Sequence, residues 1–180
     1  MASDKARQIE DIAEARIRVG GYKSFSFRDI ADEVGIKSSS VHYHFPTKTA
    51  LAARVAQRYT DRFMDRLGDP WQGDTVDLLG RLVGAFRDAL SEDGKMCLCG
   101  ALGVESADLP PEVAGEARRF FERTANWLET VYGRAANASS EGENRAKAIR
   151  LLALLEGALL VALTLQDDSL YDLATAKIPR

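Results

Sequence analysis

Apolar residues recur every three to four positions along almost the whole chain, which is the spacing of one face of an α-helix. This periodicity predicts helices over 4–20, between Ser26 and Gly35, and over 38–44, 47–67, 76–92, 97–107, 111–135, 145–166 and 169–176. No segment shows the strict alternation of a half-buried strand. The sequence therefore predicts an all-α protein.

Two short helices near the N-terminus are predicted to form a helix-turn-helix. Ser26 is suited to cap the first of them, with Asp29 three residues later as in a capping box. Gly35 ends this helix, and a tight turn leads to the second helix at 38–44. In such an arrangement the second helix enters the major groove of DNA.

The second helix, within "SSSVHYHF", has a predicted inner and outer face. At about 100° per residue, Val41 and Phe45 share the buried side, and Ser39 and Tyr43 point away from it. Ser40 lies to one side. Small serines allow close approach to DNA and can donate to or accept from any base.

Both histidines of the chain, His42 and His44, fall on opposite flanks of this helix. Flanking imidazoles can donate hydrogen bonds to the phosphate walls of the groove. Solvated surface histidines would explain the pair as well. A metal site is disfavoured, because the two side chains diverge on a helix and no Cys, Asp or Glu joins them at ligand spacing. We expect no metal and no cofactor.

The net charge of −3 is unevenly distributed. Residues 1–66 hold 12 Lys and Arg against 9 Asp and Glu, whereas the other 114 residues hold 12 against 18. A mildly basic front half is consistent with nucleic-acid contact. The start of the chain mixes both charge signs and is not expected to be a secretory signal. The most apolar stretch, 151–165, is short for a bilayer and contains Glu156, so we expect a cytoplasmic protein without a membrane partner.

The N-terminal segment resembles the DNA-binding part of tetracycline-repressor (TetR) family transcriptional regulators. The matching pieces are "GY" at 21–22, "RDIA" at 28–31, Gly35, "HYHFPTK" at 42–48 and Leu51. The resemblance covers about 45 residues in the correct order and spacing. It implies a three-helix DNA-binding domain at 1–46 and a helical ligand-binding and dimerisation domain at 47–180, with 47–67 as the linking helix.

The resemblance also implies DNA contacts at named positions. It implies backbone contacts from Ser26, His44 and Lys48, and base or backbone contacts from Ser38, Ser39 and Tyr43. With the flank and side positions of the reading helix, the expected DNA-binding set is Ser26, Ser38, Ser39, Ser40, His42, Tyr43, His44 and Lys48.

Three positions depart from the family pattern. His42 stands where the family usually has Tyr, and Phe25 where it usually has Thr or Ser. Lys37 stands where a Ser usually caps the reading helix, so the cap is expected to shift to Ser38. These three departures affect which operator sequence the protein is expected to bind.

The back half is expected to hold a dimer interface and a ligand pocket. The helix at 145–166 is apolar nearly all round, which favours either a central core helix or packing against a two-fold mate, with 111–135 contributing. The resemblance implies a four-helix dimer bundle and a small-molecule effector, which by default is apolar or aromatic. The candidate lining residues, each equally explicable as core, are Phe63, Trp71, Phe86, Met96, Cys97, Phe120 and Trp127.

The two cysteines lie together in "GKMCLCGA", at Cys97 and Cys99. A structural disulfide is not expected in the cytosol. They are read either as small buried hydrophobes or as a thiol sensor, with Lys95 near enough to lower a thiolate pKa.

The function that these features favour is a homodimeric, sequence-specific DNA-binding repressor that leaves a palindromic operator when a small molecule binds. The alternatives are a cysteine-based redox or electrophile sensor, and a helical small-molecule-binding protein or enzyme without DNA binding. An enzyme is not expected, because the chain has no nucleophile–base pair, no Gly-rich phosphate loop and no histidine outside the reading helix.

Overall fold

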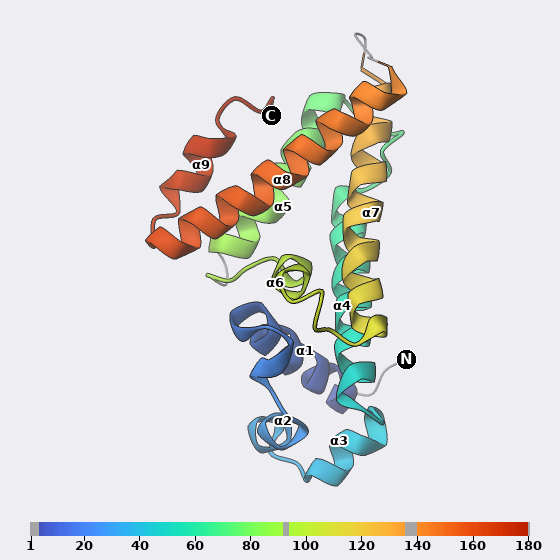
Figure 1. Cartoon of the computed structure of the whole chain (residues 1–180), viewed down its shortest axis with the longest axis vertical. Helices are drawn as coiled ribbons and strands as arrows, with labels where there is room; N and C mark the ends of the chain where they lie inside the picture. The colour runs from blue at the N-terminus through green and yellow to red at the C-terminus, as the bar shows by residue number, and fades with distance from the viewer. Residues whose placement is uncertain (1–3, 92–93, 136–139, 180) are drawn as a thin grey trace. The chain divides into compact units, whose positions relative to one another are not determined.

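The computed structural model describes residues 4–91, 94–135 and 140–179. Over these ranges every regular element is a helix, and no strand is present, so the predicted all-α class is confirmed. The helices, drawn in Figure 1, are α1 (Asp4–Gly20), the 3₁₀ helix η1 (Tyr22–Ser24), α2 (Phe27–Val34), α3 (Ser38–His44), α4 (Lys48–Leu67), α5 (Thr75–Ser91), α6 (Leu98–Val104), α7 (Pro111–Gly133), α8 (Glu141–Leu165) and α9 (Ser169–Thr175).

Most predicted boundaries agree with these helices to within two residues, and three differ. The helix predicted over 97–107 is the shorter α6, which gives way to turns after Val104. The helix predicted over 145–166 begins four residues earlier, at Glu141, because Ser140 caps α8 through a capping box with Glu143; residues 136–139 lie outside the described residues. The η1 turn was not predicted.

The chain divides into two compact units, which are described separately. The first unit comprises Met1–Thr60 and Leu98–Phe120, and the second comprises Asp61–Cys97 and Phe121–Arg180. The functional boundary predicted between residues 46 and 47 concerns DNA binding and stays a prediction.

In the first unit, α1 packs against α2, α3 and α6, and α2 packs against α3 (Figure 1). Its core is formed by side chains that are fully buried: Ile9, Ala13, Ile17, Ile30, Val41, Leu51 and Val55. Arg58 of α4 pairs with Glu10 at 2.9 Å and Glu14 at 3.1 Å of α1. Part of the positive charge counted in the front half is therefore neutralised inside this unit.

In the second unit, α8 packs against α5 and α9. The buried Tyr171 of α9 donates its hydroxyl to the carbonyl of Val83 in α5 at 2.8 Å. Arg87 of α5 pairs with Asp172 at 3.1 Å and Asp168 at 3.3 Å, which fixes α9 against α5. Arg145 of α8 also pairs with Glu129 of α7 at 3.2 Å, so α8 contacts α5, α7 and α9 within the unit.

The α8 helix is 25 residues long and has one buried face and one exposed apolar face. Its buried residues include Leu151, Leu155 and Leu159, whereas Leu160 is 53% exposed and Leu165 is 63% exposed. By length and composition α8 could cross a membrane, and the core helix of a soluble protein passes the same test. The helix is longer than its most apolar stretch, 151–165, because the polar turn at its start is also helical.

Candidate nucleic-acid interface

The α2 helix begins with a capping box on exposed residues. The N–H of Asp29 donates to the Ser26 hydroxyl at 3.2 Å, and the Asp29 carboxylate accepts from the Ser26 N–H at 2.8 Å and hydroxyl at 2.7 Å. These bonds from Ser26 hold the pKa of the Asp29 carboxyl below its usual value. The predicted capping box is confirmed. Because both donors of Ser26 are engaged with Asp29, a phosphate contact from Ser26 would have to share or replace one of them.

The turn between α2 and α3 is built on Gly35. This residue has φ 72° and ψ 38°, and its N–H bonds to the carbonyl of Ala31 at the end of α2. A glycine adopts this left-handed geometry without a Cβ clash. The next helix is capped by Lys37, whose side chain makes no capping bond, and Ser38 is its first helical residue. The expected shift of the cap to Ser38 is therefore wrong.

The α3 helix presents a polar face above a buried anchor. Val41 is fully buried, and Phe45, directly after the helix, is also buried. On the opposite side Tyr43 is 85% exposed, and Ser39 is exposed. The inner and outer positions expected from helical periodicity agree with this burial pattern. An exposed tyrosine over a packed anchor is what a helix lying in a groove requires.

The two histidines of α3 pack against aromatic rings. The His42 ring meets Phe27 of α2 edge to face, with ring centroids 4.7 Å apart, and remains exposed. The His44 ring meets Tyr43 at 5.2 Å and is half-buried. Such packing limits the orientations of each imidazole before a ligand is bound. In the described part of the chain, no three His, Cys, Asp or Glu side chains come together as metal ligands.

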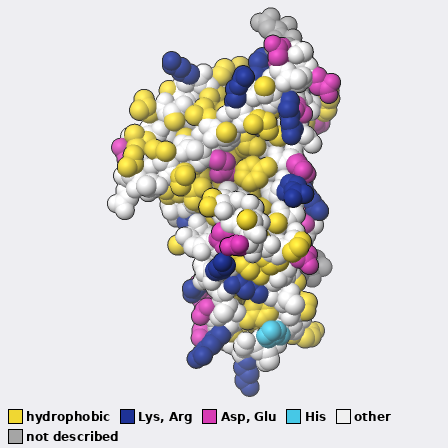
Figure 2. Space-filling model, in the orientation of Figure 1, with side chains coloured by type: hydrophobic (Ala, Val, Ile, Leu, Met, Phe, Trp, Pro, Cys, Tyr) yellow, Lys and Arg dark blue, Asp and Glu magenta, His cyan; other side chains and the backbone are white. Residues whose placement is uncertain are grey.

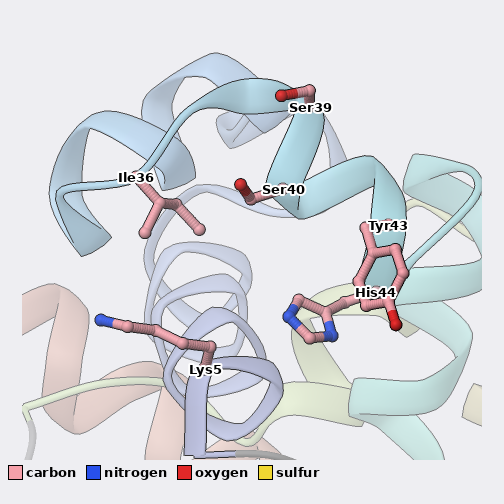
Figure 3. A pocket seen from close by; sticks show the side chains of 6 residues that line it. All are labelled: Lys5, Ile36, Ser39, Ser40, Tyr43 and His44. Atoms are coloured by element: carbon pink, nitrogen blue, oxygen red, sulfur yellow. The ribbon is translucent and has the colours of Figure 1, made fainter.

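A hollow of about 340 Å³ lies between α1 and α3 in the first unit (Figure 3). It is lined by Lys5, Ile36, Ser39, Ser40, Tyr43 and His44. Figure 3 shows Lys5, Ile36, Ser40 and His44 arranged around the same space. Lys and Arg side chains also gather over the α2–α3 end of this unit in Figure 2, next to a histidine. Lys5 therefore adds a cation beside the predicted reading helix, and sequence reasoning missed it because it lies more than 30 residues before α3.

Lys48 is held inside the first unit. Its Nζ donates to the carbonyl of Phe25 at 2.6 Å and lies over the rings of Tyr22 and Phe25, at 4.7 Å and 4.4 Å from their centroids. Burial at this place lowers the pKa of the Lys48 ammonium. One of its three N–H donors is directed at Phe25, so a phosphate contact would use the other two.

The end of α6 is bonded to the junction between α1 and α2. The carboxylate of Glu105 accepts the N–H of Tyr22 at 3.1 Å, and the Tyr22 hydroxyl lies 3.2 Å from the Thr49 hydroxyl of α4. Gly21, which precedes η1, has φ 73°. A Cβ at Gly21 would lie 1.5 Å from Oε1 of Glu105. The close approach of Glu105 thus explains why the "GY" motif has glycine at position 21. No local sequence pattern predicted that Glu105 would be the partner of this motif.

The residues expected to line a ligand pocket are divided between the two units. Phe63 and Phe86 are buried in the second unit, with ring centroids 5.4 Å apart, and the indole of Trp127 donates to the carbonyl of Gly68 at 2.8 Å. Met96, also in this unit, is half-buried. Trp71 is 68% exposed, and its place in a ligand pocket stays a prediction. Phe120 packs in the first unit against Tyr59, at 5.9 Å.

Both cysteines are fully buried and neither forms a disulfide. The Cys99 sulfur lies 4.0 Å from the Thr60 hydroxyl in the first unit. The Cys97 thiol hydrogen-bonds to the carboxyl of Glu156 in the second unit. A carboxylate beside a thiol disfavours the thiolate, whereas a thiol sensor requires it. This neighbour opposes the effect expected from Lys95.

We predict that Tyr43→Ala changes which DNA sequence is preferred while leaving the protein folded. The side chain is 85% exposed, so its removal opens no cavity, and the expected change in stability is within about 0.5 kcal/mol. Base-edge contacts determine sequence preference, whereas phosphate contacts do not. Selection of binding sites by the wild-type and the variant, with Lys48→Ala alongside, checks this. An unchanged motif for Tyr43→Ala would remove it from the base-reading set.

Comparison with known proteins was made for the sequence and for the fold. Residues 9–55 match the family described as "Bacterial regulatory proteins, tetR family". No curated protein matches the chain. The structure of a TetR transcriptional regulator from Legionella pneumophila is 31% identical, with a TM-score of 0.89, and the alignment covers 99% of this chain and 96% of that one.

Two further solved structures are similar over nearly the whole chain. A TetR-family regulator from Agrobacterium tumefaciens is 29% identical with a TM-score of 0.86, and 96% of this chain and 94% of that one are covered. The reduced form of NemR from Escherichia coli shares the fold at 19% identity, with a TM-score of 0.80 and coverage of 97% and 95%. From the match over 9–55 and the full-length similarity at 31% identity, the chain belongs to the TetR family of transcriptional regulators.

Proposed function

We propose that this protein is a sequence-specific repressor that binds a palindromic operator through α3 and is released by a small-molecule effector. The observation that carries the proposal is the exposed polar face of α3, with Tyr43 85% exposed above the fully buried Val41. A rigidly anchored helix with one such face can enter a major groove. In this reading residues 1–46 bind DNA, and residues 47–180 bind the effector and form the dimer.

The proposed DNA contacts divide into base-reading and backbone-gripping groups. Ser38, Ser39 and Tyr43, which are exposed on α3, are proposed to face base edges, together with the half-buried Ser40 at the side of the helix. The proposed phosphate contacts come from Ser26, His42, His44 and Lys48. The packing of both imidazoles against aromatic rings supports their role, because pre-oriented donors lose less entropy on binding.

We propose a homodimer whose interface is the exposed apolar face of α8, together with α9. Ile149, Leu154, Leu160, Val161 and Leu165 of α8 are between 40% and 63% exposed, and Leu173 of α9 is 74% exposed. A continuous apolar face of this kind is unfavourable in water and typical of an interface. A two-fold dimer also places two α3 helices for half-sites about 34–36 Å apart. With this face covered the protein would be soluble, and we propose a cytoplasmic location.

A redox or electrophile sensor is the less favoured alternative. Cys97 and Cys99 are fully buried, and the Cys97 thiol hydrogen-bonds to the carboxyl of Glu156. Both features oppose formation of a reactive thiolate. An enzyme or a carrier without DNA binding has no supporting feature of comparable weight.

We predict that replacing both Cys97 and Cys99 by Ser leaves release from DNA by oxidants and electrophiles unchanged, because buried thiols next to a carboxyl react slowly. The measurement is DNA affinity of the wild-type and the double variant before and after treatment with hydrogen peroxide or a quinone. Release of the wild-type alone would support the sensor instead.

The proposed function is tested by titrating binding to a duplex at several salt concentrations. Each phosphate that a cation neutralises lowers the logarithm of affinity by about 0.9 per tenfold rise in salt. With four phosphate contacts proposed per subunit, of which Lys48 carries a full charge, we expect a clear negative slope that becomes shallower in Lys48→Ala. Absence of binding at low salt would refute DNA binding.

A further inference from the structure

The inner face of α8 carries a carboxyl group, that of Glu156, for which the described part of the chain provides no cationic partner. Both oxygens of Glu156 are inaccessible to solvent, and neither has an N–H or O–H donor among the described residues. Leu152 and Leu159, one turn before and one turn after it, are buried. On a helix these positions are neighbours, so the carboxyl lies on an apolar surface.

Among the described residues of the second unit, no cation acts on the Glu156 carboxyl. The Cys97 thiol is its hydrogen-bonding neighbour, and a thiol is a weak donor. On α5, which packs against α8, Arg87 is directed to Asp172 and Asp168. Burial consequently raises the pKa of the Glu156 carboxyl to about 7, and the Cys97 hydrogen bond offsets only part of that rise.

A buried carboxyl without a partner destabilises a fold, and leucine or glutamine at the same place would avoid that penalty. Buried polar groups left without a partner are rare in native proteins, and perturbed carboxyls cluster at functional sites. The residue as a whole is half-buried although its oxygens are not accessible. Atoms of Glu156 other than its carboxyl oxygens therefore reach the surface.

We propose that Glu156 is the anchor of the effector site, and that it accepts an N–H donor from an organic cation, an amine or amidine carried on an apolar or aromatic body. This inference rests on the proposed function, which requires an effector, and it specifies the chemical class of that effector. The carboxylate supplies the charge, and Leu152 and Leu159 supply the apolar contact. The Cys97 thiol hydrogen-bonds to the same carboxyl and carries no positive charge, so it does not neutralise the Glu156 carboxylate.

The test uses the purified full-length protein without DNA and two probes of the same shape. Naphthylmethylamine is a cation at neutral pH, and naphthylmethanol is its uncharged counterpart. Binding of each is measured by calorimetry to the wild-type, to Glu156→Gln, and to Glu122→Gln. Glu122 is an exposed glutamate on α7 in the same unit and serves as the matched control. Thermal unfolding of each variant verifies that it is folded.

We expect the wild-type to bind the amine at least about tenfold more tightly than the alcohol, because a hydrogen bond to a charged partner is stronger than one between neutral groups. Glu156→Gln should lower amine affinity by about tenfold or more and leave the alcohol within about twofold. Glu122→Gln should resemble the wild-type. Equal amine affinity in the wild-type and Glu156→Gln would overturn the proposal, as would no amine binding to the wild-type at millimolar concentration.

Proton release gives a second readout that a merely structural role would not produce. Amine binding selects the ionised carboxylate, so near pH 7 the wild-type should release a fraction of a proton for each amine bound. Repeating the calorimetry in buffers of different ionisation enthalpy measures this release, and it should vanish in Glu156→Gln. Equal proton release in both proteins would place the titrating group elsewhere and overturn the assignment.

The test of amine binding at Glu156 and the test of DNA binding can fail independently of each other. Binding of the amine is measured without DNA, and DNA binding is measured without the amine. A wild-type protein that binds the amine through Glu156 and fails the salt titration would refute the repressor and keep the site. A protein that binds DNA and fails the amine test would refute the Glu156 site and keep the repressor.

Discussion

Gly21→Ala is expected to destabilise the protein by about 3 kcal/mol. Gly21 has φ 73°, where a Cβ is strained, and such strain amounts to about 1–3 kcal/mol. Its Cβ would lie 1.5 Å from Oε1 of Glu105, so this side chain must rotate away. The Tyr22 N–H, which donates to Glu105 at 3.1 Å, then loses a charged acceptor worth about 1.5–3 kcal/mol. Urea unfolding at fixed protein concentration measures the sum.

A matched control and a double variant separate the two contributions to the Gly21 effect. Gly115 is an exposed helical glycine in the same unit with open space at its Cβ, so Gly115→Ala should stabilise by about 0.5–1 kcal/mol. In a Glu105→Ala background the clash and the bond are already absent, and Gly21→Ala should there show the backbone strain alone. A Gly21→Ala protein as stable as the wild-type would contradict the geometry of this junction.

Glu156→Gln is expected to change how stability depends on pH. The pKa of Glu156 is about 7 in the folded protein, against 4.5 for the free group. Between these values the unfolded chain is ionised while the folded protein keeps its proton, so this group lowers stability progressively as pH rises. The full penalty, about 3 kcal/mol, is present above pH 7 and absent below about 4.5.

Glutamine at position 156 keeps the size of the side chain and removes its titration. The stability of Glu156→Gln relative to the wild-type should therefore increase by about 2.5 kcal/mol between pH 5 and pH 8. Urea midpoints at both pH values measure this difference, and Glu122→Gln should change it by less than about 0.5 kcal/mol. Parallel pH profiles for the wild-type and Glu156→Gln would show that Glu156 is not buried as described.

Local signals in the sequence predicted the helices and the orientation of α3. The spacing of Val41 and Phe45 identified the anchored side, and Ser26 with Asp29 identified the start of α2, because both signals act over a single turn of helix. The errors in helix boundaries lie where the local sequence pattern does not mark the end or the start of the helix clearly. No glycine or proline stands between Val104 and Pro110 to mark the end of α6, and yet residues 105–107 form turns. Ser140 starts α8 inside a segment that is polar in sequence.

Contacts between distant segments were not predictable from the sequence. Lys5 reaches the hollow beside α3, and Glu105 reaches Tyr22, across 83 residues in the second case. Lys48 was expected to bind phosphate. In the structure its Nζ also donates a hydrogen bond to the carbonyl of Phe25, which no local sequence pattern predicts. Similarly, Glu156 was noted in an apolar stretch, but its lack of an N–H or O–H donor among the described residues became visible only once α5 and Cys97 were placed.

The central claim is that α3 reads operator DNA as part of a dimer. Selection from a random duplex pool, followed by titration of the enriched sequence at two salt concentrations, tests it most directly. We predict an enriched inverted repeat with half-sites about one helical turn apart and an affinity that falls steeply with salt. No enrichment, with negligible binding even at low salt, would contradict it.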